Sequence, residues 1–142
     1  MKKIILLVAG LIWTVLFWNF FLRGYVLLPS AERFVSGFYD QYNNRDFDYI
    51  YEVLSGQKIR NHMSRPQFEA MMRETYNKLG PVKTRRKISW KAKFGQKEVY
   101  FLIAYKVKRA KTESTEKFTL VKKGKLWFVF DYVVRSASFL SR

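Results

Sequence analysis

The chain has 142 residues, a length that suits one domain with a short appendage. Its hydrophobic content of 49% excludes an intrinsically disordered chain, and the absence of cysteine excludes disulfides, thiolate catalysis and cysteine-based metal centres. The net charge is +16, of which residues 83–142 carry +13.

The N-terminus contains an apolar run from Ile4 to Leu22, in which Thr14 and Asn19 are the only clearly polar residues. As a helix this run would be about 28 Å long, close to the roughly 30 Å of a bilayer hydrocarbon core. Aromatic residues crowd its second half, as in segments that end at a membrane–water interface. The sequence predicts a tail at 1–3, a transmembrane signal anchor at 4–22 and a juxtamembrane linker at 23–30.

A cleaved signal peptide, which would release a secreted domain, is the alternative for this segment. Signal peptides have shorter apolar stretches and small residues before the cleavage point, whereas cleavage after Ala31 would place Pro29 at position −3. Lys2 and Lys3 favour a cytoplasmic N-terminus. We therefore expect a single-pass protein of the bacterial inner (cytoplasmic) membrane with its folded domain on the periplasmic, extracytoplasmic side.

The folded domain is predicted at residues 31–135 and begins with helices. Ser30 can cap a first helix that Asn43-Asn44 ends, and Asp46 can cap a second, short helix that reaches Leu54. Residues 57–63 are compatible with a short edge strand. A third helix begins at Ser64, where Gln67 completes a capping box, and ends before Gly80-Pro81.

Strand patterns follow, with period 2 replacing period 3.6. The expected strands are 82–94, 99–107, 115–122 and 126–134, separated by a turn at 95–97, a polar loop at 108–114 and a hairpin turn at 123–124. Short turns require antiparallel pairing. The predicted fold class is α+β, in which a transmembrane helix precedes a cone-shaped domain of about three helices packed on a bent antiparallel sheet of four, or five, strands. A tail is expected at 136–142.

The element order and several motifs resemble a known fold family. The motifs are the stretches Ser64–Phe68 and Leu79–Arg85, the alternation at 99–107, Glu116 and the strand start Lys125–Trp127. Over residues 33–135 they are similar to the nuclear-transport-factor-2-like, or cystatin-like, superfamily and to its bacterial family catalogued as domain of unknown function 4019. The resemblance implies an α+β cone and no established catalytic residues. The heavy lysine load and long anchor depart from the usual member.

Candidates for chemistry are few. The single histidine, His62, would need Asp40, Asp46, Asp48 or Asp131 beside it to form an acid–base pair, and no spacing requires this. Asp40 and Asp131 are possible polar groups of an internal cavity. One histidine and scattered aspartates are not a metal ligand set, and no phosphate-binding glycine loop is present. We expect no catalytic residues, no metal and no cofactor, and a non-enzymatic protein.

The basic C-terminal half is the main functional signal. The odd positions of strand 82–94 place five cations on one face, and further cations end the next strand and surround the last hairpin. This expected anion-binding set is Lys83, Arg85, Lys87, Lys91, Lys93, Lys106, Lys108, Arg109, Lys122, Lys123 and Lys125.

Several functions are compatible with this set. The first is a membrane-anchored accessory domain that contacts anionic lipid or an acidic protein of an envelope complex. The others are a cone that binds a small apolar ligand or is an enzyme, and nucleic-acid binding with Trp90 or Trp127 stacking on bases. A solvated basic surface without a partner is the simplest alternative.

Overall fold

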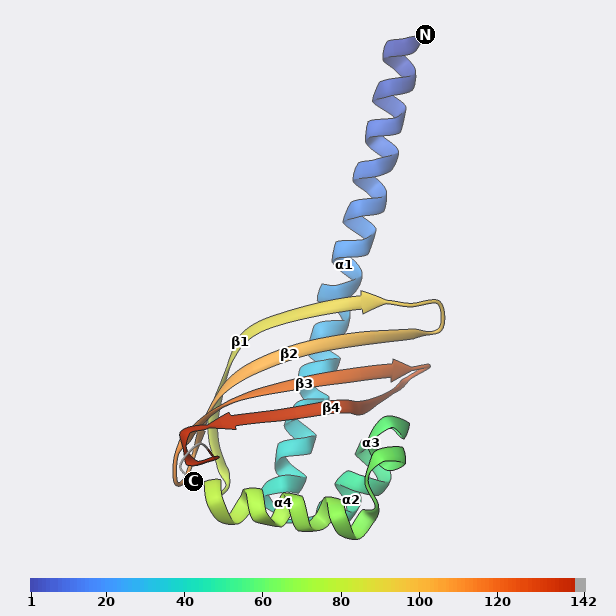
Figure 1. The fold of residues 1–142 in the computed structure, drawn as a ribbon. Helices are drawn as coiled ribbons and strands as arrows, with labels where there is room; N and C mark the ends of the chain where they lie inside the picture. Colours follow the sequence, from blue (N-terminus) through green and yellow to red (C-terminus); the bar gives the residue numbers. More distant parts are fainter. Residues whose placement is uncertain (140–142) are drawn as a thin grey trace.

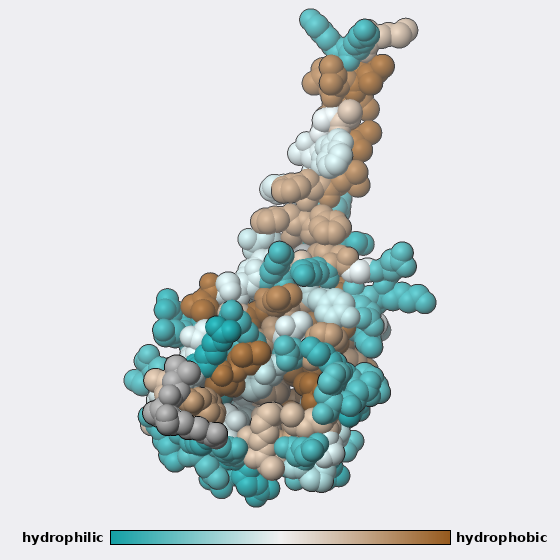
Figure 2. All heavy atoms as spheres, in the orientation of Figure 1, coloured by the Kyte–Doolittle hydropathy of each residue, from teal (hydrophilic) through white to brown (hydrophobic). Residues whose placement is uncertain are grey.

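The computed structural model describes residues 1–139, and it contains helices followed by one antiparallel sheet (Figure 1). The N-terminal half of the first helix projects away from the rest of the molecule, and its surface is hydrophobic (Figure 2). This helix is the one among the described residues that is long and apolar enough to cross a membrane. The α+β class and the N-terminal apolar helix agree with the sequence-based expectation.

The first helix, α1, runs without interruption over Lys2–Asn43. The expected helix start at Ser30 is therefore wrong, and residues 23–30, expected as a juxtamembrane linker, are helical. Pro29 lies inside α1, and the Ser30 hydroxyl donates to the Leu27 carbonyl rather than capping a new helix. A buried stripe continues across the proline and compensates for its missing hydrogen bond: Gly24, Leu28, Ala31, Val35, Phe38, Tyr39 and Tyr42.

Two of the three shorter helices lie where the sequence predicts a helix. α2 spans Phe47–Tyr49, where Asp46 accepts a hydrogen bond from the Tyr49 amide, and it continues as a π-helical turn over Ile50–Leu54. α4 spans Arg65–Leu79 with the expected capping box and ends at Gly80. The expected edge strand at 57–63 is wrong, because α3 occupies Gln57–His62. The only extended pairing nearby within residues 1–139 is an isolated bridge from Ser55 to Val129.

Four strands form a sheet in the order β1-β2-β3-β4, with every neighbouring pair antiparallel. Their bounds are β1 Val82–Phe94, β2 Glu98–Arg109, β3 Glu113–Lys123 and β4 Leu126–Ser136. The sheet is curved, and α1 crosses its concave face (Figure 1). The four predicted strands are confirmed, and a 3-10 turn, Ala137–Phe139, follows them. The predicted tail at 136–142 ends in residues 140–142, which lie outside the described part of the chain.

Strand β1 contains a β-bulge that its sequence pattern does not reveal. Lys87 pairs with Tyr105, but the next aligned pair is Ser89 with Ala104, so Ile88 is the extra residue. An inserted residue exchanges the two faces of the strand beyond it. From Thr84 to the bulge the odd positions of β1 share the core face, and after the bulge the even positions do.

The core lies between α1 and the concave face and is built largely from rings. Phe38 and Tyr39 of α1 pack edge-to-face on Phe118 of β3, with ring centroids 5.1 and 5.5 Å apart. Tyr132 of β4 stacks on Phe118 at 4.6 Å. Because α1 supplies this central layer, the domain core depends on the same helix that carries the apolar N-terminal run.

Replacing Pro29 by alanine tests whether α1 is one continuous helix. Pro29→Ala restores a backbone donor in an exposed helical position, so the free energy of unfolding should rise by about 1–3 kcal/mol. Thermal unfolding of the full chain in detergent, followed by circular dichroism, measures the change. Val26→Ala on the same helix is the control and should change the free energy of unfolding by only a few tenths of the Pro29→Ala effect. A lower stability of Pro29→Ala would mean that the chain breaks at residue 29.

Candidate functional site

The convex face of the sheet carries a group of exposed cations without ion pairs. Residues that pair directly across strands share a face, and Leu102, Ala104, Lys106 and Lys108 point away from the buried side of β2. The strand register places eight cations on this side, beside the carboxylates of Glu98, Glu113 and Asp131. Lys123 pairs with Glu98. The other seven, which we call the convex-face cations, are Arg86, Lys91, Lys93, Lys106, Lys108, Lys117 and Arg135. All seven are exposed, and none forms an ion pair with another residue in the range 1–139.

Four of the eleven cations expected to bind an anionic partner belong to the convex-face cations: Lys91, Lys93, Lys106 and Lys108. The expectation that five odd positions of β1 share one face is wrong because of the bulge at Ile88. Arg85 and Lys87 lie on the concave side, where Lys87 pairs with Glu32 at 2.7 Å and the Arg85 guanidinium lies 5.3 Å from the Tyr39 ring centre.

The remaining expected cations have other surroundings. Arg109 is fully buried and pairs with Glu116, so it cannot meet a partner at the surface. Lys123 pairs with Glu98 at 3.2 Å. Lys83 is exposed at a second irregularity of β1. Lys122 and Lys125 lie near the β3–β4 turn, where they line a shallow depression with Arg33.

Sequence reasoning missed three members of the convex face, namely Arg86, Lys117 and Arg135. Lys117 lies between the buried Glu116 and Phe118, so period-2 alternation along β3 could have found it. Arg135 extends β4 beyond its predicted end at residue 134. Arg86 could not have been assigned, because its face depends on the position of the bulge.

A buried polar network fills the end of the core opposite the apolar run. The Glu116 carboxylate accepts hydrogen bonds from Arg109 Nε at 2.7 Å and from the hydroxyls of Tyr39, Tyr132 and Ser114, each at 2.6 Å. Arg109 also donates to the Gly80 carbonyl and to the Tyr132 hydroxyl, at 3.2 and 3.0 Å. The network joins α1, β2, β3 and β4 at one point.

Burial and hydrogen bonding oppose each other in the titration of this network. Burial by itself raises the pKa of Glu116, but the Arg109 hydrogen bond and charge, with the Ser114 and Tyr132 hydroxyls, bring it below its ordinary value. Burial raises the pKa of Tyr39 and of Tyr132 well above the ordinary value, and raises that of Tyr42 to about 12. At neutral pH the network therefore contains one anion, one cation and protonated phenols.

This network is arranged for stability rather than for chemistry. Both Glu116 oxygens are occupied by donors, and both charged side chains have no exposed surface. A general base needs a lone pair that can reach a substrate. One hydroxyl stands apart: Tyr42 Oη has no hydrogen-bond partner among residues 1–139, although its ring lies 4.7 Å from the Arg109 guanidinium.

A separate cavity of about 280 Å³ opens beneath β4, between the strand and the helices α3 and α4. Its walls are mainly apolar and include Phe38, Ile59, Met63, Phe68 and Met71, while His62 and Asp131 lie at its edge. Both of these polar residues are exposed, and the His62 Nδ1 atom lies 2.8 Å from the Lys58 carbonyl oxygen, to which it donates.

The other acids expected near a cavity have local roles or none. Asp40 is exposed on α1 and does not line the cavity, so its expected burial is wrong. Asp46 caps α2, and Asp48 pairs with Arg65 at 2.6 Å. In the part of the chain that the structure describes, no group of three His, Asp or Glu side chains is arranged to hold a metal ion.

Two conservative substitutions test which tyrosine hydroxyls contribute to stability through the network. Tyr39→Phe removes a hydrogen bond to a buried carboxylate and should lower the free energy of unfolding by about 1.5–3 kcal/mol. Tyr42→Phe removes a hydroxyl that makes no hydrogen bond and should change it by less than about 1 kcal/mol. Urea unfolding of the full chain in detergent, followed by tryptophan fluorescence, gives both values. Equal losses would show that the hydroxyl of Tyr42 is also bound.

The lowered pKa of Glu116 predicts a loss of stability in acid. A carboxyl group whose pKa falls on folding stabilises the protein above its unfolded pKa of 4.5. That stability is lost as the pH falls through the lower folded-state pKa. Ser114→Ala removes one donor to the charged form, so the midpoint of acid unfolding should move to higher pH, by up to about one unit. Thr115→Ala, one residue along β3, is the control and should leave the midpoint in place.

Comparison with known proteins gives no family for this chain. No protein-family model matches it, and no curated protein matches it either. The resemblance to nuclear-transport-factor-2-like proteins therefore stays a prediction. Function has to be inferred from the arrangement of the described residues.

Proposed function

We propose that this chain is a non-enzymatic interaction domain that α1 holds at the bacterial inner membrane, on the periplasmic side. In this proposal the convex face of the sheet binds an acidic surface of a neighbouring envelope protein. The observation that carries the proposal is the set of seven exposed convex-face cations without ion pairs among the described residues. Residues that only solubilise a domain have no reason to collect on one face.

Retention of the anchor is supported by the continuity of α1. Leu28 and Ala31 are 8% and 0% exposed, so they belong to the domain core although they lie in the same helix as the apolar run. Cleavage after Ala31 would remove Leu28 from that core and would uncover Trp90, against which Gly24 packs. A domain built in this way folds with its N-terminal helix attached.

The direction of the convex face favours a protein partner over a lipid surface. The strands lie one beyond another along α1, with β1 nearest the N-terminal end, so the faces of the sheet point sideways from the helix (Figure 1). If α1 crosses a bilayer, the convex face is directed parallel to the membrane surface and not toward it. A neighbouring protein of opposite charge is the partner that this direction suits.

Nucleic-acid binding would need Trp90 or Trp127 to be free to stack on bases beside the convex-face cations. Trp90 stacks on Phe101 of the core face, with ring centroids 5.8 Å apart, and the Trp127 Nε1 atom donates to Ser30 of α1 at 3.1 Å. Both rings are thus engaged on the concave side. Bases bound among the convex-face cations would not reach them.

A small apolar ligand is the second candidate, and the cavity beneath β4 is the observation in its favour. The volume of about 280 Å³ and the Phe and Met walls suit a small apolar molecule. Its polar groups are exposed rather than aimed inward, and the buried carboxylate of the domain is already saturated. The convex face therefore remains the stronger candidate site.

Photo-crosslinking in cells tests the protein-partner proposal. A photoreactive amino acid replaces Lys117, which is exposed between Ala104 and Val133 on the convex face. We expect a discrete protein adduct. Its yield should fall about fivefold or more in Arg86→Gln/Lys106→Gln/Arg135→Gln, because each exposed ion pair contributes up to about 1 kcal/mol.

The matched control removes the same charge elsewhere, at Arg60, Arg73 and Lys125, each replaced by glutamine. These residues are exposed outside the convex face, so the adduct should persist at its original yield. The proposal fails if no adduct forms, or if both triple variants reduce it equally. Recovery of lipid adducts alone would replace the protein partner by the membrane.

A further inference from the structure

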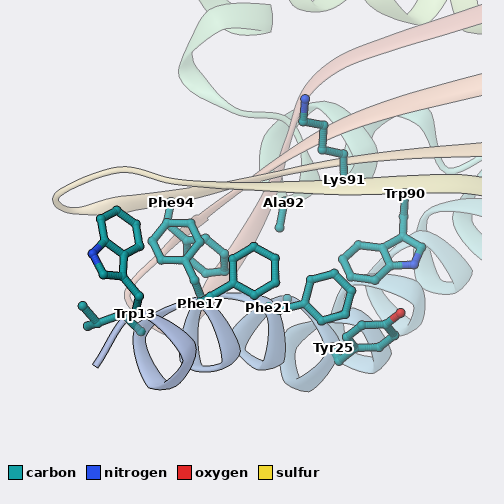
Figure 3. A pocket seen from close by; sticks show the side chains of 11 residues that line it. Trp13, Phe17, Phe21, Tyr25, Trp90, Lys91, Ala92 and Phe94 are labelled. Carbon is teal, nitrogen blue, oxygen red and sulfur yellow. The ribbon is translucent and has the colours of Figure 1, made fainter. Parts of the chain in front are cut away.

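A groove separates residues 13–25 of α1 from the second half of β1. It has a volume of about 610 Å³, and its walls are almost wholly apolar (Figure 3). Rings from both elements face each other across it, with Trp13, Phe17, Phe21 and Tyr25 on the helix and Trp90 and Phe94 on the strand. No other described cavity combines residues of the apolar run with residues of the folded domain.

Two ring contacts bridge the groove and hold its walls in place. Phe20 packs edge-on against Phe94 at 5.1 Å, and Tyr25 packs edge-on against Trp90 at 5.0 Å. Gly24 permits this approach, because a Cβ atom there would lie 3.0 Å from the Trp90 ring. The hairpin that joins β1 to β2 is therefore fixed beside the end of the apolar run.

This position determines what surrounds the groove, and the inference rests on the proposed role of α1 as a membrane anchor. If Ile4–Leu22 spans the hydrocarbon core, Trp13 to Phe21 lie within it and Phe94 lies near its boundary. An open apolar groove at that depth is in contact with acyl chains. Water would leave its aromatic walls unfavourably hydrated.

Cations collect at the same level. Lys91 extends from the opposite side of β1 (Figure 3), where the strand register also places Lys93. Lys97 lies in the β1–β2 turn, and Arg23 lies on α1 just after the apolar run. All four are exposed, and none pairs with an acid among residues 1–139. An apolar groove with unpaired cations beside its outer end complements a molecule that has an apolar chain and an anionic head.

We propose that the groove between α1 and β1 holds an acyl chain of an anionic phospholipid, whose headgroup meets the cations of the β1–β2 hairpin. The aromatic walls contact the chain, and Lys91, Lys93 and Lys97 select for negative charge. Bound in this way, the lipid fastens the hairpin to the membrane and limits rotation of the convex face about α1.

Quenching of tryptophan fluorescence by lipids with brominated acyl chains tests the groove directly. The full chain is reconstituted into phosphatidylcholine vesicles that contain brominated phosphatidylglycerol or brominated phosphatidylcholine at the same mole fraction. Trp13→Phe/Trp18→Phe leaves Trp90 and Trp127 as reporters. Trp13→Phe/Trp18→Phe/Trp90→Phe leaves Trp127 alone, which lies against Ser30 within the domain.

We expect quenching in the first protein and little in the second, and stronger quenching by the anionic lipid than by the neutral one. Lys93→Gln/Lys97→Gln should reduce that preference about fivefold or more at low salt, since each cation near an anionic surface contributes about 1 kcal/mol. Lys58→Gln/Lys125→Gln, which removes equal charge elsewhere, should preserve it.

A second pair of variants changes the groove without changing charge. Leu16→Phe fills the groove from its helical wall and should lower quenching of Trp90. Leu22→Phe makes the same change on the opposite side of α1, outside the groove, and should not. Both positions face lipid in the proposed orientation, so neither substitution disturbs the domain core.

The outcomes separate this inference from the anchor on which it rests. Protein that does not float with vesicles overturns the anchor. Protein that floats but shows no quenching of Trp90, or equal quenching by both lipids, overturns the lipid site and leaves the anchor intact. Quenching that increases as the protein is diluted in the membrane would show that a second copy occupies the groove instead.

Discussion

The continuity of α1 is the constraint on which the rest of the structure depends. One helix of 42 residues carries the apolar run at its N-terminal end and the central aromatic layer of the core at its C-terminal end. A helix transmits position along its axis without a flexible joint. The sheet is therefore held at a fixed height and orientation relative to the apolar run, which a chain with a linker at 23–30 could not achieve.

The polar network at Glu116 secures the other end of α1. Hydrogen bonds to the carboxylate come from four elements, so the helix and the last three strands meet at one charged group. Burying an ion pair gains little net stability, but a buried pair that lacks some of its hydrogen bonds is costly. The network therefore favours the one fold in which every hydrogen bond to Glu116 is made. With its lone pairs occupied, the carboxylate holds the fold together and leaves recognition to the surface.

The backbone, as well as the sequence, determines which face of the sheet each charged residue of β1 occupies. The bulge at Ile88 moves Arg85 and Lys87 to the concave side and brings Arg86 to the convex side. The result is one side that packs on α1 and another that carries the seven convex-face cations. An edge strand rich in lysine also resists pairing with strands of other molecules, so β1 can lie exposed at the edge of the sheet.

The sequence by itself determined the elements that local chemistry specifies: the apolar helix, the Ser64 capping box, the Gly80 stop and four strands with antiparallel order. Periodicity and capping act within a few residues, so they can be interpreted without the fold. Only the tertiary structure decided that α1 continues through Pro29, that residues 57–62 are helical, and which cations share a face. Those outcomes depend on packing against distant residues and on residues inserted into β1, and neither leaves a local signal.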